Sequence, residues 1–373
     1  MFLVIRLRKA VLFVSLFLCA AIPVCLLVFL LKPDLVPVSS VPEKTDQAVM
    51  ACIDKLVAVR NDSLLRGDLE TVERFYNIKV RNGLYAYDHE VKKTKYLKNW
   101  AQKQGVQFIS IKSRTQKKWI KADTDKITVN FLASTEYRYV YRDRPEVENV
   151  MRIGTYHEIV LHQYENVWLI SREWYTDPFA DALDLENIDM EEERNFILSQ
   201  EAARSLDIND RRLRAVEYAD TYCGAASSGE NGYDYNKEYK NYNHVGGDCA
   251  NFVSQVLYAG GFKKTGTWNY HKDGSRAWLK SQALKDFMLY SGRASLLAYG
   301  SYGEVLKASY KLLPGDIVAY WKKGKVVHVA VVTGADSRGY ALVNCHNTDR
   351  YRVPWDLGWS DSRIRFYLLR VHY

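Results

Sequence analysis

Apolar side chains follow two different periods in the first half of this 373-residue chain. Residues 46–60 and 62–76 repeat them at helical intervals, which predicts two helices. From residue 127 the period changes to two, and runs rich in β-branched and aromatic side chains predict strands. These runs are residues 127–131, 156–161 and 167–174. Helices followed by long antiparallel strands predict an α+β layer over residues 46–176.

A second set of elements lies behind an acidic segment, residues 177–207, which predicts a linker. An amphipathic helix over residues 211–223 begins this set, behind Asn209-Asp210. A short helix then ends before Gly260-Gly261. Two β-branched runs bounded by turn signals predict buried strands over residues 324–334 and 341–349. These elements predict a separate α+β domain that extends from residue 208 to residue 373.

The N-terminus carries an uncharged stretch from Ala10 to Leu31, preceded by basic residues in segment 1–9. About 20 apolar residues suffice to cross a bilayer. The positive charges predict a cytoplasmic segment 1–9 and an exported remainder, joined to the anchor by a tether over residues 32–45. We therefore expect a single-pass cell-membrane protein with a transmembrane helix over residues 10–31. A cleaved signal peptide, followed by secretion, is the alternative.

The segment GGDCANFVSQVLYAGGF places a cysteine where a helix begins. Unpaired N–H groups and the helix dipole favour an anion there, which lowers a thiol pKa from about 8.5. Cys249 is therefore the candidate nucleophile, and Asp248 is suited to cap the helix. We expect the backbone N–H groups of Asp248 and Cys249 to stabilise an oxyanion, with Tyr242 as a further donor.

A cysteine nucleophile needs a base and a group that orients the base. The run KVVHVAVVTG places a single histidine, His328, in a predicted buried strand. The next predicted strand, ALVNCHNTD, supplies a third polar group in either His346 or Asn347. The sequence therefore predicts a Cys–His arrangement in the chain order nucleophile, base, orienting residue.

The same residues also have structural explanations. A histidine such as His328 in an apolar strand is commonly a satisfied core residue. Cys249 is one of four cysteines outside the apolar N-terminus, and a disulfide with Cys52, Cys223 or Cys345 would abolish its nucleophilic role.

In combination, the motifs DCANFVSQ, LPGDIVAYW, HVAVVTG and CHNTD resemble the putative amidase domain family. That family is related to papain-like bacterial cell-wall cysteine hydrolases of the NlpC and CHAP type. The resemblance covers residues 208–373 and implies a thiol helix packed on an antiparallel sheet. It carries the nucleophile onto Cys249, the base onto His328, and the third residue onto His346, with Asn347 as the alternative.

The resemblance implies a cysteine amidase or thiol peptidase that cleaves amide bonds of peptidoglycan, or of its stem peptides, through an acyl-enzyme. Neither a metal nor another cofactor is implied. Residues 46–176 resemble the cone-shaped fold of nuclear-transport-factor-like proteins, which implies a spacer or a ligand-binding module. Two alternatives stay open: an inactive cell-wall binding or assembly protein that uses the fold as a scaffold, and a protein-directed acyltransferase.

Charge and composition narrow the classes of partner. The net charge is +8, from 52 basic and 44 acidic residues, and the basic residues form no focused stripe of the kind that nucleic-acid binding requires. Residues 46–176 show no metal cluster and no glycine-rich phosphate loop. We therefore expect no nucleic acid as a partner. The resemblance implies peptidoglycan or its stem peptides as a partner, and the apolar stretch over residues 10–31 implies the membrane.

Overall fold

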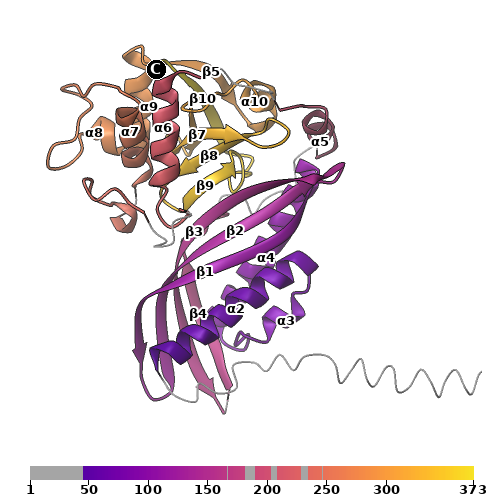
Figure 1. The fold of residues 1–373 in the computed structure, drawn as a ribbon. Helices are drawn as coiled ribbons and strands as arrows, with labels where there is room; N and C mark the ends of the chain where they lie inside the picture. The colour runs from indigo at the N-terminus through magenta and orange to yellow at the C-terminus, as the bar shows by residue number, and fades with distance from the viewer. Residues whose placement is uncertain (1–44, 166, 181–189, 203–207, 228–233, 246) are drawn as a thin grey trace, which may run out of the picture.

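The computed structural model describes residues 45–373, apart from residues 166, 181–189, 203–207, 228–233 and 246 (Figure 1). Three helices open the described part: α2 (Asp46–Arg66), α3 (Glu70–Glu73) and α4 (Arg81–Gln104). The Thr45 hydroxyl accepts a hydrogen bond from the Ala48 N–H at the start of α2, and Gly67 ends the helix in the left-handed region at φ 74°. The prediction of separate helices over 46–60 and 62–76 is therefore wrong, because the stop signal is Gly67.

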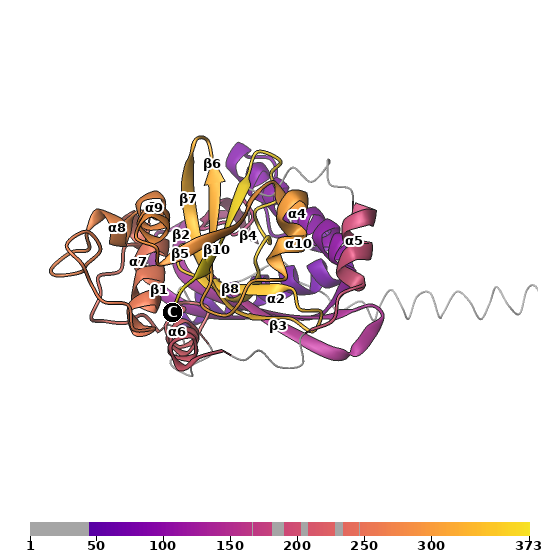
Figure 2. The same ribbon diagram turned by 90° about the horizontal axis from the view of Figure 1, so that it is seen from above.

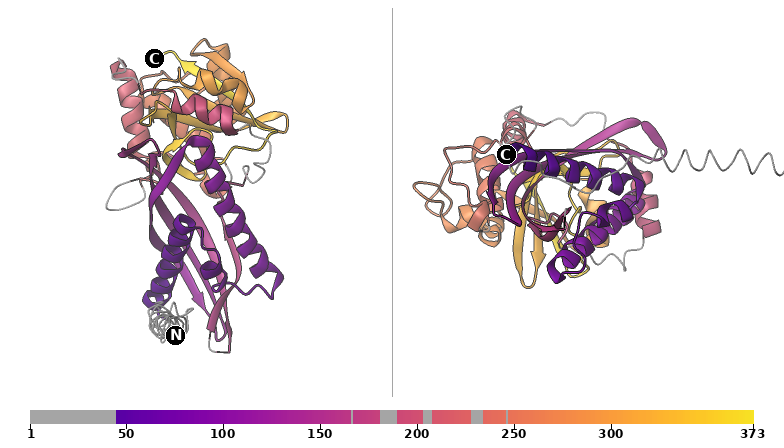
Figure 3. Two further views of the ribbon diagram at one scale, coloured as in Figure 1. Left: turned by 90° about the vertical axis from the view of Figure 1, so that its right-hand side faces the viewer. Right: turned by 90° about the horizontal axis from the view of Figure 1, so that it is seen from below.

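Four consecutive antiparallel strands follow these helices, and they curve around α2 and α4 (Figure 3). They are β1 (Val106–Ala122), β2 (Lys126–Tyr141), β3 (Arg144–Tyr164) and β4 (Val167–Tyr175). Alternate residues of β2, among them Ile127, Val129 and Phe131, are fully buried in a core shared with α2. The period-two pattern in the sequence therefore marks the residues of β2 whose side chains face the helices.

The second half of the chain forms shorter helices and strands (Figure 1). The helices are α5 (Met190–Leu198), α6 (Asp210–Thr221), α7 (Cys249–Ala259), α8 (Arg276–Leu279), α9 (Ser281–Tyr290) and α10 (Tyr302–Ser309). The strands are β5 (Ala294–Gly300), β6 (Ile317–Lys322), β7 (Lys325–Ala335), β8 (Ala341–Cys345), β9 (Asp349–Pro354) and β10 (Arg365–Val371). Helices α6 and α7 and strand β7 confirm the elements predicted at their positions.

The strands of both halves belong to one ten-stranded sheet, in which every pair of named strands is antiparallel. Its order is β1-β2-β3-β9-β8-β7-β6-β10-β5, with β4 paired to β3. The halves join where Arg152, Ile153 and Gly154 of β3 pair with residues 349–351 of β9. Gly154 allows a close approach, because a Cβ there would lie 2.4 Å from the Ala225 Cβ.

The predicted fold class is therefore wrong. We expected a transmembrane helix, a cone-like α+β domain and a papain-like domain with its own sheet. The structure instead shows a single, mostly antiparallel sheet with helices packed on it, which are seen from above in Figure 2. A buried core also spans both halves, since Trp100 of α4 and Tyr139 of β2 pack with Val343 of β8 and Trp355. Pairing between segments some 200 residues apart leaves no local periodic signal.

The predicted localisation as a single-pass cell-membrane protein is also contradicted. In the described part of the chain, no helix combines the length and the apolar character needed to cross a bilayer. The predicted span, residues 10–31, lies outside the described residues, as do segment 1–9 and most of the predicted tether.

Candidate functional site

Strand β7 separates two buried clusters in the second half of the chain. Val329 and Val331 belong to the cluster that contains Cys249 and residues of helices α6, α7 and α9. We call this side of the sheet the thiol face. Ala330 and Val332 contact the opposite cluster, which contains Tyr320 and Trp355. Successive side chains of a strand point to opposite sides of the sheet, so the position of each residue along β7 decides which face its side chain lies on.

Cys249 is the first residue of α7, as the sequence predicts, and its thiol is free. Cys52, Cys223 and Cys345 are free thiols as well, so the disulfide alternative does not apply. The Cys249 side chain is 2 % exposed, and its Sγ lies 3.2 Å from the Ser281 hydroxyl.

The predicted lowering of the Cys249 pKa does not occur in this structure. Burial raises the pKa, and it outweighs the hydrogen bond with Ser281 and those with the backbone N–H groups of Val329 and Ala250, all of which lower it. The charge of Asp248 also raises it. The helix start thus supplies N–H groups at the sulfur, but the closed environment keeps the thiol protonated at neutral pH.

His328 lies in β7 next to Val329, but its ring belongs to the other face of the sheet. The imidazole stacks on Trp359 with a centroid separation of 5.1 Å, and it lies 5.3 Å from the Tyr320 ring. Burial, followed by the charge of Arg350, lowers the pKa of His328 to about 3, so the ring is neutral. Among the described residues, no hydrogen bond joins this ring to Cys249, whose side-chain partner is the Ser281 hydroxyl.

His346 instead pairs with the residue that precedes the thiol. Its Nδ1 lies 2.6 Å from Asp248 Oδ2, and its Nε2 lies 2.7 Å from the Tyr222 carbonyl oxygen. Both neighbours are acceptors, so both ring nitrogens must donate and the ring is an imidazolium. The ring also stacks on Phe252 of α7 at 4.2 Å. His346 therefore holds the start of the thiol helix against the end of α6.

The Asp248 carboxylate is used for tertiary contacts rather than as a helix cap. No side-chain cap hydrogen bond is formed at the start of α7. Asp248 Oδ1 instead accepts from the Tyr242 N–H at 3.1 Å and from the Asn251 side-chain amide at 2.7 Å. The Asp248 N–H donates to Asn347 Oδ1 at 3.0 Å, which ties the thiol segment to the turn after β8.

Tyr242, the predicted oxyanion donor, directs its hydroxyl elsewhere. The hydroxyl donates to Asp273 Oδ1 at 2.9 Å. The structure therefore brings Asp248, Cys249, His346 and Asn347 together around the start of α7, while the side chains of Tyr242 and His328 lie apart from the thiol.

Sequence reasoning missed Ser281, whose hydroxyl is the side-chain partner of the thiol. Ser281 begins α9, and a serine at a helix start reads as a cap, so no sequence signal separates this role from an ordinary one. Asn251 was also missed, although it follows Cys249 by two residues. Its amide donates to Asp248, and its carbonyl accepts from the Trp278 indole N–H at 2.9 Å.

The described residues contain no group of three or more His, Cys, Asp or Glu side chains arranged to hold a metal ion. Two buried carboxylates near His346, those of Asp248 and Asp349, are of the type that binds metal ions, but both already have hydrogen-bond partners. Asp248 is paired with the ring, while Asp349 accepts from the Ala225 N–H and the Tyr235 hydroxyl.

The Asp248–His346 pair predicts a pH dependence of stability. Burial alone would lower the pKa of His346, but the hydrogen bond with Asp248 and the charges of Asp349 and Asp248 raise it. This stabilisation is complete below the unfolded-state pKa of about 6.5, and it is lost as pH rises through the raised folded-state pKa. We expect His346→Gln to cost about 3–5 kcal/mol of unfolding free energy at pH 6, because it leaves Asp248 unpaired, and less at pH 9.

Urea unfolding at the two pH values checks this result. The matched control is His271→Gln, at an exposed position, whose effect should be small and equal at both. A His346→Gln cost that does not change between pH 6 and pH 9 would show that the ring is neutral in the folded protein.

Comparison with known proteins finds a family model that matches the part of the chain with the thiol site. Residues 209–369 match the family model described as a putative amidase domain. The match indicates an amidase-type hydrolase, and it contains α6, the thiol helix α7, strands β5 to β9 and most of β10.

Two Bacillus subtilis proteins are similar to parts of the chain. The uncharacterized protein YhbB is 28% identical over 160 residues, which are 40% of this chain and 45% of that protein. The uncharacterized protein YjcM is 32% identical over 130 residues, which are 32% of this chain and 28% of that protein. The chain thus spans less than half the length of each of these relatives.

Solved structures resemble about a third of the chain. The intermembrane space region of the chloroplast protein ARC6 covers 36% of this chain and 98% of its own, at 9% identity and a TM-score of 0.27. A putative scytalone dehydratase from Novosphingobium aromaticivorans covers 35% and 84%, at 12% identity and a TM-score of 0.25. Scores this low carry no functional argument. Neither match supports the predicted relation to papain-like hydrolases of the NlpC and CHAP type.

Proposed function

We propose that the second half of the chain is a cysteine amidase that cleaves amide bonds of peptidoglycan, with Cys249 as nucleophile. The observation that carries the proposal is a free thiol at the first residue of α7, with the backbone N–H groups of Ala250 and Val329 at the sulfur. These groups offer the donors that a thiolate and an oxyanion require. The substrate class rests on the resemblance of the motifs to cell-wall hydrolases.

In the proposed reaction, His328 takes the thiol proton while the sulfur attacks the amide carbonyl carbon. The C–N bond then breaks, the leaving amine takes that proton, and water hydrolyses the thioester to a carboxylate and the free thiol. A neutral imidazole is the form that accepts a proton, and His328 is neutral in the closed structure. A pKa of about 3 is too low for it to take a proton from a thiol, so the reaction also requires this pKa to rise when the ring leaves its buried position. Asp248 and His346 position the start of α7, with Asn347 as a further tie to the sheet.

This reaction requires the His328 ring to move to the thiol face. A β-bulge lies beside it, because Tyr320 pairs with His328 while Trp321 pairs with Val326, which leaves Val327 extra. Bulges can re-aim a neighbouring side chain, and they are frequent next to active sites. We propose that the His328 ring moves at this bulge when substrate binds. This movement converts the closed site into a reactive one.

Product analysis tests the proposal. The protein is incubated with purified peptidoglycan fragments, and the products are identified by mass. A new amine together with a new carboxylate supports hydrolysis and names the bond that is cut. Unchanged fragments over a range of pH would contradict it.

A specific observation favours one competing function, a wall-binding or assembly scaffold without catalysis. The thiol is buried with a raised pKa, and His328 is packed on the other face of β7. Reaction with iodoacetamide, mapped by mass, separates the two functions. We expect Cys249 to react more slowly than a free thiol at pH 7 when the protein is alone, and faster when peptidoglycan fragments open the site. Equal, slow labelling with and without fragments would favour the scaffold.

A further inference from the structure

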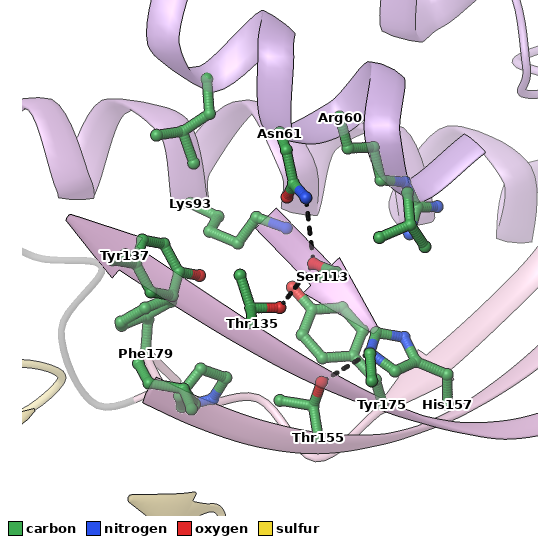
Figure 4. A pocket seen from close by; sticks show the side chains of 15 residues that line it. Arg60, Asn61, Lys93, Ser113, Thr135, Tyr137, Thr155, His157, Tyr175 and Phe179 are labelled. Carbon is green, nitrogen blue, oxygen red and sulfur yellow. Dashed lines mark hydrogen bonds between the residues drawn. The ribbon is translucent and has the colours of Figure 1, made fainter. Parts of the chain in front are cut away.

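The first half of the chain contains a second polar site, far along the sequence from Cys249. A cavity of about 50 Å³ lies between helices α2 and α4 and the facing side of strands β1 to β3 (Figure 4). A cavity needs roughly 10–15 Å³ to hold one water, so this cavity has space for about four non-hydrogen atoms. Its polar lining includes Asn61 of α2, Lys93 of α4 and Tyr137 of β2.

The charged groups at this cavity are already balanced. Arg60 forms two hydrogen bonds with the Glu173 carboxylate, at 2.9 and 2.5 Å, and both side chains are nearly inaccessible. Lys93 lies 2.5 Å from Glu90. A charged ligand would therefore place an uncompensated charge in a site that excludes most water, which is costly.

His157 adds no charge to this balance. Its Nδ1 lies 3.2 Å from Glu173 Oε1, and its Nε2 lies 2.7 Å from the Thr155 hydroxyl. A neutral ring satisfies both contacts, because Nδ1–H donates to the carboxylate and Nε2 accepts from the hydroxyl. Burial lowers the pKa of His157, in agreement with this neutral form.

Besides Arg60, whose buried Nε–H has no partner among the described residues, three lining groups retain hydrogen-bonding capacity. Tyr137 is 7% exposed, and its hydroxyl has no hydrogen-bond partner among the residues that the structure describes. Asn61 uses one end of its amide to donate to the Ser113 hydroxyl at 2.9 Å, which leaves the other end open. The Lys93 ammonium has three N–H groups, and one carboxylate does not use them all. Figure 4 shows these three side chains around the cavity.

We propose that this cavity binds a small neutral amide group of the size of acetamide. An amide oxygen accepts hydrogen bonds from Tyr137 and Lys93, and an amide N–H donates to the open end of Asn61. The methyl group packs against the apolar walls formed by Ile153 and Phe179. Such a ligand uses the open hydrogen-bonding capacity of Tyr137 and Asn61 without adding charge. This inference does not depend on the thiol chemistry of the second half.

Ligand-observed NMR tests the proposal with acetamide as the probe and acetate as its isosteric, charged control. We expect saturation transfer from the protein to the acetamide methyl protons and none to those of acetate. Equal transfer to both molecules, or none to acetamide, would overturn the proposal.

Two variants locate the binding. Tyr137→Phe removes the free hydroxyl and keeps the ring packing, and Asn61→Leu keeps a helix-forming residue on α2. Each should weaken acetamide binding about tenfold, as expected for one lost hydrogen bond. The control Tyr85→Phe, on an exposed part of α4, should leave it unchanged. Acetamide binding that persists unchanged in Tyr137→Phe would place the ligand elsewhere, and circular dichroism confirms that each variant is folded.

Discussion

Replacing Cys249 by serine should reduce amide hydrolysis of peptidoglycan fragments by about 10⁴-fold or more, to the background of the assay. The hydroxyl of serine has nearly the size of the thiol, so the packing at this buried position is kept. It is far less acidic, however, and the site was inferred to act through a sulfur anion. Release of the new amine, quantified by mass, measures the effect.

The matched control for this variant is Cys345→Ser. Cys345 is also a buried free thiol in the second half of the chain, and it has no part in the proposed reaction. Hydrolysis should therefore persist in Cys345→Ser if the protein is folded, which unfolding midpoints establish. Equal hydrolysis by the wild type and Cys249→Ser would end the cysteine mechanism, whereas loss in both variants would point to damaged packing.

Replacing Lys103 by methionine should destabilise the protein by about 3–5 kcal/mol, because it leaves a buried carboxylate without its counter-charge. The Lys103 ammonium of α4 is paired with Asp356, and both side chains are 2% exposed. Asp356 also accepts from the Trp100 indole at 3.2 Å and from the Tyr340 hydroxyl at 2.9 Å. This cluster joins the two halves of the chain, so its loss should weaken the shared core.

Urea unfolding measures the change, with two variants for comparison. Arg66→Met removes an exposed partner of Asp62 and should cost no more than about 0.5 kcal/mol. The double variant Lys103→Met with Asp356→Leu should recover part of the loss, because the unpaired charge is gone. A Lys103→Met effect below about 1 kcal/mol would mean that water reaches Asp356.

Local sequence patterns predicted those elements whose apolar residues face one core. The helix that begins at Cys249 belongs to this class, whereas strand β7 was predicted from a continuous β-branched run and is buried on both faces of the sheet. Strand β1 was missed because it is an edge strand with polar and basic residues through most of its length, as in KSRTQKKWIK. Helix α4 was missed because its buried residues serve two different cores, so no single apolar stripe stands out.

The environment of the candidate site could be predicted only in part. The sequence places Cys249 at a helix start, and the structure agrees. The structure also shows that Asp248 pairs with His346, that Ser281 contacts the thiol, and that the His328 ring packs on Trp359. Each of these contacts joins segments at least 30 residues apart. The face of His328 depends on one extra residue, Val327, which alternation alone does not reveal.

The sequence by itself determined the helix start that carries the thiol, the strand that carries His328 and the resemblance to an amidase family, because these depend on short-range spacing. The tertiary structure decided that both halves share one sheet, that burial raises the thiol pKa, and which partner each histidine has. The physical reason is that register, desolvation and buried ion pairs depend on which distant segments are in contact. These contacts cannot be read from the order of residues along the chain.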